Sequence, residues 1–148
     1  MIPIHIRRGE APEFEAFLCE RIYAYNAAAT GYHDAECFSA ALEGQDGAVE
    51  AGVCGYTWGG CCYVSYLWVL ERLRGQGIAS SILAAVERHA RATGCRLVLL
   101  STHSFQAPGF YRRHGYRELA MVPDHPLGHA SFFLAKQLAE GETSSGGR

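Results

Sequence analysis

The sequence has no apolar run long enough to span a membrane, and Met1–Glu10 lacks the hydrophobic segment of a signal peptide. These two absences predict a cytoplasmic protein without a membrane partner. The formal net charge of −2 leaves the chain without the basic surface that nucleic-acid-binding proteins carry, so we expect no nucleic-acid partner. No internal repeat is visible.

The six cysteines form no C-x-x-C pair, and none stands at a ligand-like spacing from the seven histidines. Neither a metal site nor a disulfide framework is therefore predicted. Small thiols are common in protein cores, so we expect these cysteines to be reduced and buried. A redox role for the adjacent Cys61 and Cys62 is the alternative, but neighbouring residues of a strand point to opposite faces of its sheet.

Length and hydrophobic content favour a single globular domain. The chain has 148 residues, 49% of them hydrophobic, which is enough to form a core without disulfides or metal. We place this domain at residues 1–139. The remainder, residues 140–148, is rich in Ser and Gly and is predicted to be a disordered tail.

The alternation of strand-like and helix-like segments indicates an α/β protein. A first helix begins at Pro12 and ends between Asn26 and Gly31, a second begins at Ile78, and a short third occupies Pro108–His114. Strands are predicted at residues 2–8, 37–43, 48–58, 64–70, 96–102, 116–122 and 130–138.

At the centre of the sequence, a strand, a glycine turn and a helix follow one another directly. An apolar run ends at Leu70, an Arg/Gly segment occupies residues 72–77, and apolar residues then recur at helical spacing. The start of such a helix presents free backbone N–H groups and the positive end of the helix dipole. This arrangement predicts a phosphate-binding site.

Two common phosphate loops do not match this segment. A P-loop requires Lys-Ser or Lys-Thr after its second glycine, but Gly77 is followed by Ile78 and Ala79. The dinucleotide fingerprint requires a third glycine early in a βαβ unit, whereas this segment has Ser80 there and lies in mid-chain.

Residues 74–79, RGQGIA, resemble the Q/R-x-x-G-x-G/A signature of the GCN5-related N-acetyltransferases, the GNAT family. A second family pattern, N-x-x-A-x-x-x-Y-x-x-x-G-F/Y, occurs about 25 residues later with Ala107, Tyr111, Gly115 and Tyr116 in place. Ser104 replaces its usual Asn, which affects one cofactor contact. Both motifs have the family's order and spacing, and the resemblance extends from Ile4 to Leu138.

The resemblance implies a mixed, partly splayed sheet of about six or seven strands with helices on both sides, and acetyl-CoA entering the splay as co-substrate. It assigns the oxyanion-binding N–H groups to Val69 and Leu70. Arg112 and Arg113 either reach the nucleotide phosphate or form a solvated helix face. The residues that it assigns to the remaining cofactor contacts are Arg74, Gly75, Gln76, Gly77, Ala79, Ser80 and Ser104.

Acetyl transfer to an amine requires a base for the ammonium and an acid for the departing thiolate. Glu71 is the candidate base; alternatively it is an exposed charge, or it pairs with Arg72 or Arg74. The family motif makes Tyr111 the candidate acid, because a phenol can donate a proton to a thiolate. A core tyrosine packed against Phe110 is the alternative for Tyr111.

The segment after the first helix lines the acceptor pocket in GNAT proteins, and the loop at residues 123–128 often closes over the substrate. As alternatives, the tyrosines of these segments are packing residues and the loop residues cap a turn. The substrate-binding candidates are Tyr25, Tyr32, His33, Asp34, Asp124 and His125.

Charge divides the sequence into an acidic part and a basic part. Residues up to Glu71 include ten acidic and three basic side chains, and those from Arg72 include five acidic and ten basic. A phosphate-bearing cofactor beside a cationic amine would favour this division, although a chance distribution of surface charge also explains it.

We therefore predict an acyltransferase that N-acetylates a small cationic amine by direct attack in a ternary complex. Residues 94–116 and 126–138 resemble a bacterial subgroup that includes aminoglycoside 2′-N-acetyltransferases of the kasugamycin-resistance type. The rival hypotheses are a protein or peptide N-acetyltransferase and a non-catalytic acyl-CoA-binding module. A homodimer is compatible with the sequence, which does not specify the oligomeric state.

Overall fold

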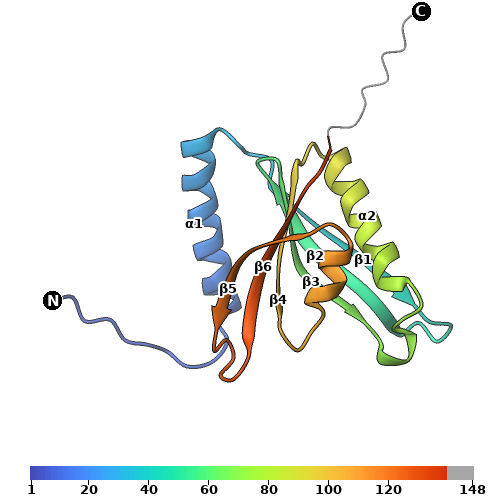
Figure 1. The fold of residues 1–148 in the computed structure, drawn as a ribbon. Coiled ribbons are helices and arrows are strands. Elements are labelled where there is room, and N and C mark those ends of the chain that lie inside the picture. The colour runs from blue at the N-terminus through green and yellow to red at the C-terminus, as the bar shows by residue number, and fades with distance from the viewer. Residues whose placement is uncertain (140–148) are drawn as a thin grey trace, which may run out of the picture. The chain divides into compact units, whose positions relative to one another are not determined.

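A computed structural model describes residues 1–139 of the chain, which forms two compact units, Met1–His33 and the part that begins at Asp34 (Figure 1). The single domain expected over residues 1–139 stays a prediction. The tail expected at residues 140–148 lies outside the described residues.

The first unit contains one helix, α1, at Pro12–Thr30. Pro12 opens the helix, and Glu13 and Glu15 lie in its first turn, where they interact favourably with the helix dipole. The helix ends at Gly31, which has a left-handed φ of 78° and donates its N–H to the Ala27 carbonyl over 2.8 Å. The predicted helix and its end are therefore confirmed.

The strand predicted at residues 2–8 is wrong, because the structure has no strand in that segment. Ile2, Ile4 and Ile6 alternate as they would in a strand, yet all three are exposed. Alternation shows which face a strand would bury, but a strand also needs a neighbour for its backbone N–H and C=O groups.

The second unit is a six-stranded sheet with the strand order β1-β2-β3-β4-β6-β5. Only β3 and β4 are parallel; every other neighbouring pair is antiparallel. This confirms an α/β fold with a mixed sheet flanked by helices. The strands are β1 Glu36–Glu43, β2 Val49–Trp58, β3 Cys61–Val69, β4 Leu97–His103, β5 Arg117–Pro123 and β6 Ala130–Gln137.

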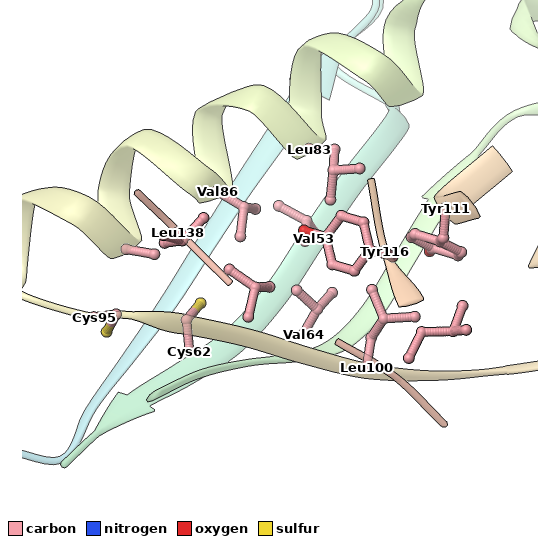
Figure 2. Packing of buried hydrophobic residues seen from close by; sticks show 13 residues of the cluster. Val53, Cys62, Val64, Leu83, Val86, Cys95, Leu100, Tyr111, Tyr116 and Leu138 are labelled. Atoms are coloured by element: carbon pink, nitrogen blue, oxygen red, sulfur yellow. The ribbon is translucent and has the colours of Figure 1, made fainter. Parts of the chain in front are cut away.

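Two helices connect the strands of this unit. Helix α2, Ile78–Ala92, links β3 to β4, and α3, Pro108–Arg113, links β4 to β5. Both helices pack on the same face of the sheet, since residues of both belong to one buried cluster (Figures 1 and 2). Leu83 and Val86 of α2 meet Val53, Val64 and Leu100 of the strands there.

Strands β3 and β4 splay apart after four paired residues. Val64 pairs with Leu100, and the pairing ends there although β3 continues to Val69. A bulge follows at once: Val64 pairs with Gly55 of β2 and Tyr66 with Cys54, which leaves Ser65 as the extra residue. A bulge bends its strand, so it carries the rest of β3 away from β4.

Gly55 makes this bulge possible. A Cβ at this position would lie 2.0 Å from the Tyr63 carbonyl oxygen and 2.8 Å from Cζ of Phe38. Any side chain other than hydrogen would therefore force the backbone of β2 or β3 to move.

The prediction of buried cysteines is only partly confirmed. Cys62 and Cys95 are buried, Cys54 and Cys61 are half-buried, and Cys19 and Cys37 are exposed. All six are free thiols. Burial, with smaller contributions from Cys95 and Cys61, raises the pKa of Cys62 to about 12. A thiol with so high a pKa is a poor nucleophile at neutral pH, which argues against the redox alternative.

Candidate active site

The splay exposes backbone groups at the end of β3. The N–H of Leu70 points toward β2 and donates to the Glu50 carbonyl over 2.8 Å. Successive residues of a strand direct their backbone groups to opposite sides, so the N–H of Val69 points into the splay. Val69 is thus available as an oxyanion donor, whereas the expectation for Leu70 is corrected because its N–H is already used.

The glycine loop leaves the start of α2 open to a ligand. Gly75 and Gly77 have left-handed φ angles of 73° and 82°, and the space that a Cβ would enter is empty at both. No side chain in the described part of the chain caps α2, and its first turn contains no acidic residue. Its N–H groups therefore remain available for an anion.

A cleft with a volume of about 340 Å³ lies between this loop, the start of α2 and α3. Two arginines, Arg74 and Arg113, line it, and no carboxylate of residues 1–139 does. The predicted cofactor residues that line it are Val69, Arg74, Gly75, Gly77, Ala79 and Ser80; it is also lined by Leu73, Ile78, Phe110, Arg113 and His114, of which the sequence suggested only Arg113.

A larger groove of about 740 Å³ lies between β1 and α2. Its lining is mostly apolar and, among the described residues, contains no arginine or lysine, so the smaller, cationic cleft is the better site for phosphate. Gln76 lines this groove, and its amide donates to the Arg72 carbonyl over 3.0 Å. The structure therefore directs the Gln76 side chain away from the predicted phosphate contact.

Arg74 is held in place from within the loop. Its Nε donates to the Val69 carbonyl over 3.0 Å, which ties the guanidinium to the end of β3. Arg72 instead pairs with Glu50. The two arginines that flank Leu73 thus have different roles, and only Arg74 lines the cleft.

Tyr111 lies on α3 and belongs to the buried cluster that contains Val64 and Leu100, the last pair before the splay (Figure 2). Burial raises the pKa of its phenol, so the group stays protonated at neutral pH. Within residues 1–139 its hydroxyl makes no hydrogen bond. The proton is therefore available, as a general acid requires.

Glu71 is not the last residue of β3. It begins a short 3₁₀ turn, Glu71–Leu73, two residues beyond the end of the strand at Val69. Its side chain is exposed, and neither Arg72 nor Arg74 pairs with it among the described side chains. Its role as a base stays a prediction.

The C-terminal end of β4 carries an aromatic and imidazole cluster that the sequence did not indicate. His103 stacks on Phe105 with ring centroids 5.2 Å apart and contacts the His125 ring edge-on at 5.3 Å. Its Nδ1 donates to the His125 carbonyl over 3.1 Å, and Phe105 also meets His129. The sequence does not reveal that these rings are neighbours, because His125 is 22 residues from His103.

Three other predicted residues have structural contacts. Ser104 Oγ accepts the N–H of Ala130 over 3.1 Å, and Asp124 Oδ1 accepts the N–H of Gly128 over 3.2 Å, so Asp124 caps a turn. Asp34 Oδ1 accepts the N–H of Gly59, which precedes β3. Asp34 thus lies at the opposite end of β3 from the splay, too far away to contact an acceptor there.

Tyr25, Tyr32 and His33 belong to the first unit. Tyr25 is exposed on α1, and the backbone N–H of Tyr32 donates to Thr30 Oγ1 over 3.2 Å. Their place in an acceptor pocket stays a prediction. Within residues 1–139, no three His, Cys, Asp or Glu side chains lie together as metal ligands. In the same part of the chain, no helix is long and apolar enough to cross a membrane.

The cleft fits a diphosphate, because helix N–H groups and two arginines face a space that no carboxylate of the described residues lines. Comparisons with known proteins agree with this chemistry. Residues 33–118, more than half of the chain, match the acetyltransferase (GNAT) domain family. GNAT acetyltransferases use acetyl-CoA.

Two curated relatives and one solved structure illustrate the similarity. Blasticidin-S acetyltransferase from Streptomyces morookaense is 41% identical over 64% of this chain and 71% of its own length. An acetyltransferase of Agrobacterium fabrum is 32% identical over 84% of this chain and 91% of its own. The crystal structure of an acetyltransferase from Bacillus cereus superimposes with a TM-score of 0.75 at 36% identity, covering 91% and 98% of the two chains.

The family match, the relatives and the open cationic cleft lead to the same conclusion. This chain belongs to the GNAT family of acetyltransferases and is an acyltransferase that uses acetyl-CoA.

Proposed function

We propose that this enzyme N-acetylates a small cationic antibiotic by direct transfer from acetyl-CoA in a ternary complex. The acceptor suggested by the sequence is an aminoglycoside of the kasugamycin type. The 41% identity to a blasticidin-S acetyltransferase makes blasticidin S a second candidate. A cytoplasmic location is part of the proposal.

One observation carries this proposal: within residues 1–139, a phosphate cradle without carboxylates and a phenol without a hydrogen bond occur at the same splay. The cradle lies at the start of α2. Tyr111 packs with the residues at which β3 and β4 separate. An acetyl thioester anchored by its pyrophosphate would reach this phenol along the splay.

Each residue has a distinct task in the proposed reaction. Arg74 and Arg113 would bind the pyrophosphate with the N–H groups of the glycine loop. The Val69 N–H would stabilise negative charge on the carbonyl oxygen, and Tyr111 would protonate the thiolate as the C–S bond breaks. Glu71 would accept a proton from the acceptor ammonium directly or through water. Bound acetyl-CoA supplies the activated acetyl group.

Thiol release from acetyl-CoA, measured against a panel of amines, tests the function. The panel contains kasugamycin, blasticidin S, polyamines, amino acids and a lysine-containing peptide. We expect turnover with one cationic antibiotic and none with the peptide. A preference for the peptide would establish the rival peptide acetyltransferase, and binding of acetyl-CoA without any turnover would favour the non-catalytic module.

The phosphate cradle has its own test, which needs no acceptor. Gly77→Val should abolish acetyl-CoA binding in calorimetry, because the side chain would occupy the open space at a left-handed position. Gly47→Val is the matched control: its φ is 78°, the space at its Cβ is also empty, and it lies in the β1–β2 turn. Normal binding by Gly77→Val would remove the cradle from the proposal.

A further inference from the structure

His114, the residue that follows α3, links that helix to the phosphate cradle at the start of α2 through its two ring nitrogens. Nδ1 lies 2.8 Å from the Phe110 carbonyl oxygen. Because a carbonyl oxygen only accepts, Nδ1 must carry a hydrogen. Nε2 lies 3.0 Å from Oγ of Ser80, a cleft residue in the first turn of α2.

These contacts determine what the Ser80 hydroxyl does at each charge state of His114. In the neutral ring, Nε2 has a lone pair and no hydrogen, so Ser80 must donate its O–H to His114. The Ser80 oxygen then has only lone pairs to present to the cleft, and these repel a phosphate oxygen. In the imidazolium, Nε2 donates to Ser80, and the serine O–H is released to donate to a phosphate.

Positive side chains line the cleft beside His114, and a bound pyrophosphate would bring negative charge to it. Arg74 of the loop and Arg113 of α3 line the same cleft, and α2 contributes only Ser80 to the contact. Phe110 packs against the imidazole with ring centroids 4.4 Å apart. The negative charge of a bound pyrophosphate would favour an imidazolium at His114.

We propose that His114 is a positioning residue for the pyrophosphate of acetyl-CoA, which it binds indirectly by turning the Ser80 hydroxyl, and that cofactor binding is coupled to uptake of a proton by His114. This inference rests on the assignment of the pyrophosphate to the α2 cradle. It also predicts the sign of the pH dependence: affinity for acetyl-CoA rises as the pH falls, because the complex binds the extra proton.

Calorimetry of acetyl-CoA binding in buffers of different ionisation enthalpy measures the proton uptake. We expect uptake by the unmodified enzyme and none by His114→Gln, whose amide does not titrate. His89→Gln is the matched control, since His89 lies on α2 outside the cleft. Uptake that persists in His114→Gln, or that is absent from the unmodified enzyme, overturns the proposal.

A second pair of variants tests the route through Ser80. Ser80→Ala should abolish the uptake and weaken binding about tenfold, as expected for loss of a hydrogen bond to a charged group. Adding His114→Gln to Ser80→Ala should then weaken binding no further. Undiminished uptake by Ser80→Ala would show that His114 responds to the phosphate directly, which contradicts the indirect route.

The phosphate responsible is identified with dephospho-CoA, which has the pyrophosphate but lacks the 3′-phosphate. Proton uptake with this ligand supports the pyrophosphate, and its disappearance overturns that assignment. Gly77→Val distinguishes a failure of the proposed phosphate cradle from a failure of the proposed role of His114. If that variant binds acetyl-CoA normally, the cradle is wrong; if it loses binding while the uptake tests fail, only the role of His114 is wrong.

A spectroscopic measurement checks the same step without any turnover. Nitrogen NMR of the His114 ring should show that acetyl-CoA, added at constant pH, increases the fraction of rings with a hydrogen on Nε2 as well as on Nδ1. A ring that stays neutral in the saturated complex contradicts the proposal.

Discussion

Tyr111 and Tyr116 are the same residue type, five positions apart and both buried, yet their hydroxyl groups lie in opposite environments. Their rings meet edge-on with centroids 5.8 Å apart. The Tyr111 hydroxyl has no hydrogen bond in the described part of the chain, whereas Tyr116 donates to Glu87 over 3.2 Å. One tyrosine can give up its proton, and the other uses its proton to hold the core.

The hydroxyl of Tyr116 faces an ionic cluster centred on the buried Glu87 carboxylate. Glu87 of α2 accepts hydrogen bonds from Lys136 Nζ at 3.0 Å to each carboxylate oxygen, and Arg91 approaches to 3.9 Å. Burial, together with the neighbouring Glu87 carboxylate, raises the pKa of Tyr116 far above its ordinary value. A phenol held in this way contributes stability rather than chemistry.

The largest effect should come from removing the free hydroxyl. Tyr111→Phe should lower kcat by about 10²- to 10⁴-fold, the usual contribution of a general acid, and leave acetyl-CoA affinity unchanged. Thiol release and calorimetry measure the two quantities. Tyr116→Phe is the control and should retain most of kcat. Equal losses of turnover and affinity in Tyr111→Phe would refute its role as an acid.

The second largest effect should come from disrupting the ionic cluster that contacts the Tyr116 hydroxyl. Lys136→Met should lower the free energy of unfolding by about 2 to 4 kcal/mol, because it leaves the buried Glu87 carboxylate without its main partner. Urea denaturation measures this change. Arg112→Met is a control that breaks the exposed pair with Glu118 and should cost less than about 1 kcal/mol. Similar losses in both variants would show that the Glu87–Lys136 pair contributes no more to stability than the exposed Arg112–Glu118 pair.

The two hydroxyls should also differ in their contribution to stability. Tyr116→Phe should cost about 1 to 2 kcal/mol, because it removes a buried hydrogen bond to a carboxylate. Tyr111→Phe should change the free energy of unfolding by no more than about 0.5 kcal/mol, since no protein hydrogen bond is lost. Denaturation of the two variants under identical conditions tests this, and a larger cost for Tyr111→Phe would reverse the comparison.

The smallest effect concerns alkaline pH. Both pKa values are raised in the folded protein, Tyr116 more strongly, so above pH of about 10 the unfolded chain releases phenol protons that the folded protein retains. Stability should therefore be complete below that pH and decline above it. Tyr116→Phe should flatten the decline more than Tyr111→Phe. Denaturation series on either side of this pH measure the slopes, and equal slopes in both variants would contradict the stronger shift at Tyr116.

Local patterns in the sequence predicted the elements of the site well. The boundaries of α1 followed from Pro12 and Gly31, and the start of α2 followed from the glycines before it, because caps and turns depend on nearby residues. The cleft contains most of the predicted cradle residues. The strand at residues 2–8 was wrong because its formation depends on a distant partner.

Contacts between distant residues were beyond the sequence for the same reason. Ser80 and His114 are 34 residues apart, and nothing in either segment indicates that their side chains meet. Likewise, the hydrogen bond from Leu70 to Glu50 follows from the register of β2 and β3, which no motif specifies. Both features change the predicted site, one by adding a residue and one by removing a donor.

By itself the sequence determined the glycine loop, the helix that follows it and the position of Tyr111 in its motif, because each depends on residues close together along the chain. Only the tertiary structure decided where β3 leaves β4. That point depends on Ser65 forming a bulge opposite Gly55, whose missing side chain makes room for the Tyr63 carbonyl. The tertiary structure also decided which tyrosine is free, since the partner of Tyr116 lies 29 residues away on α2.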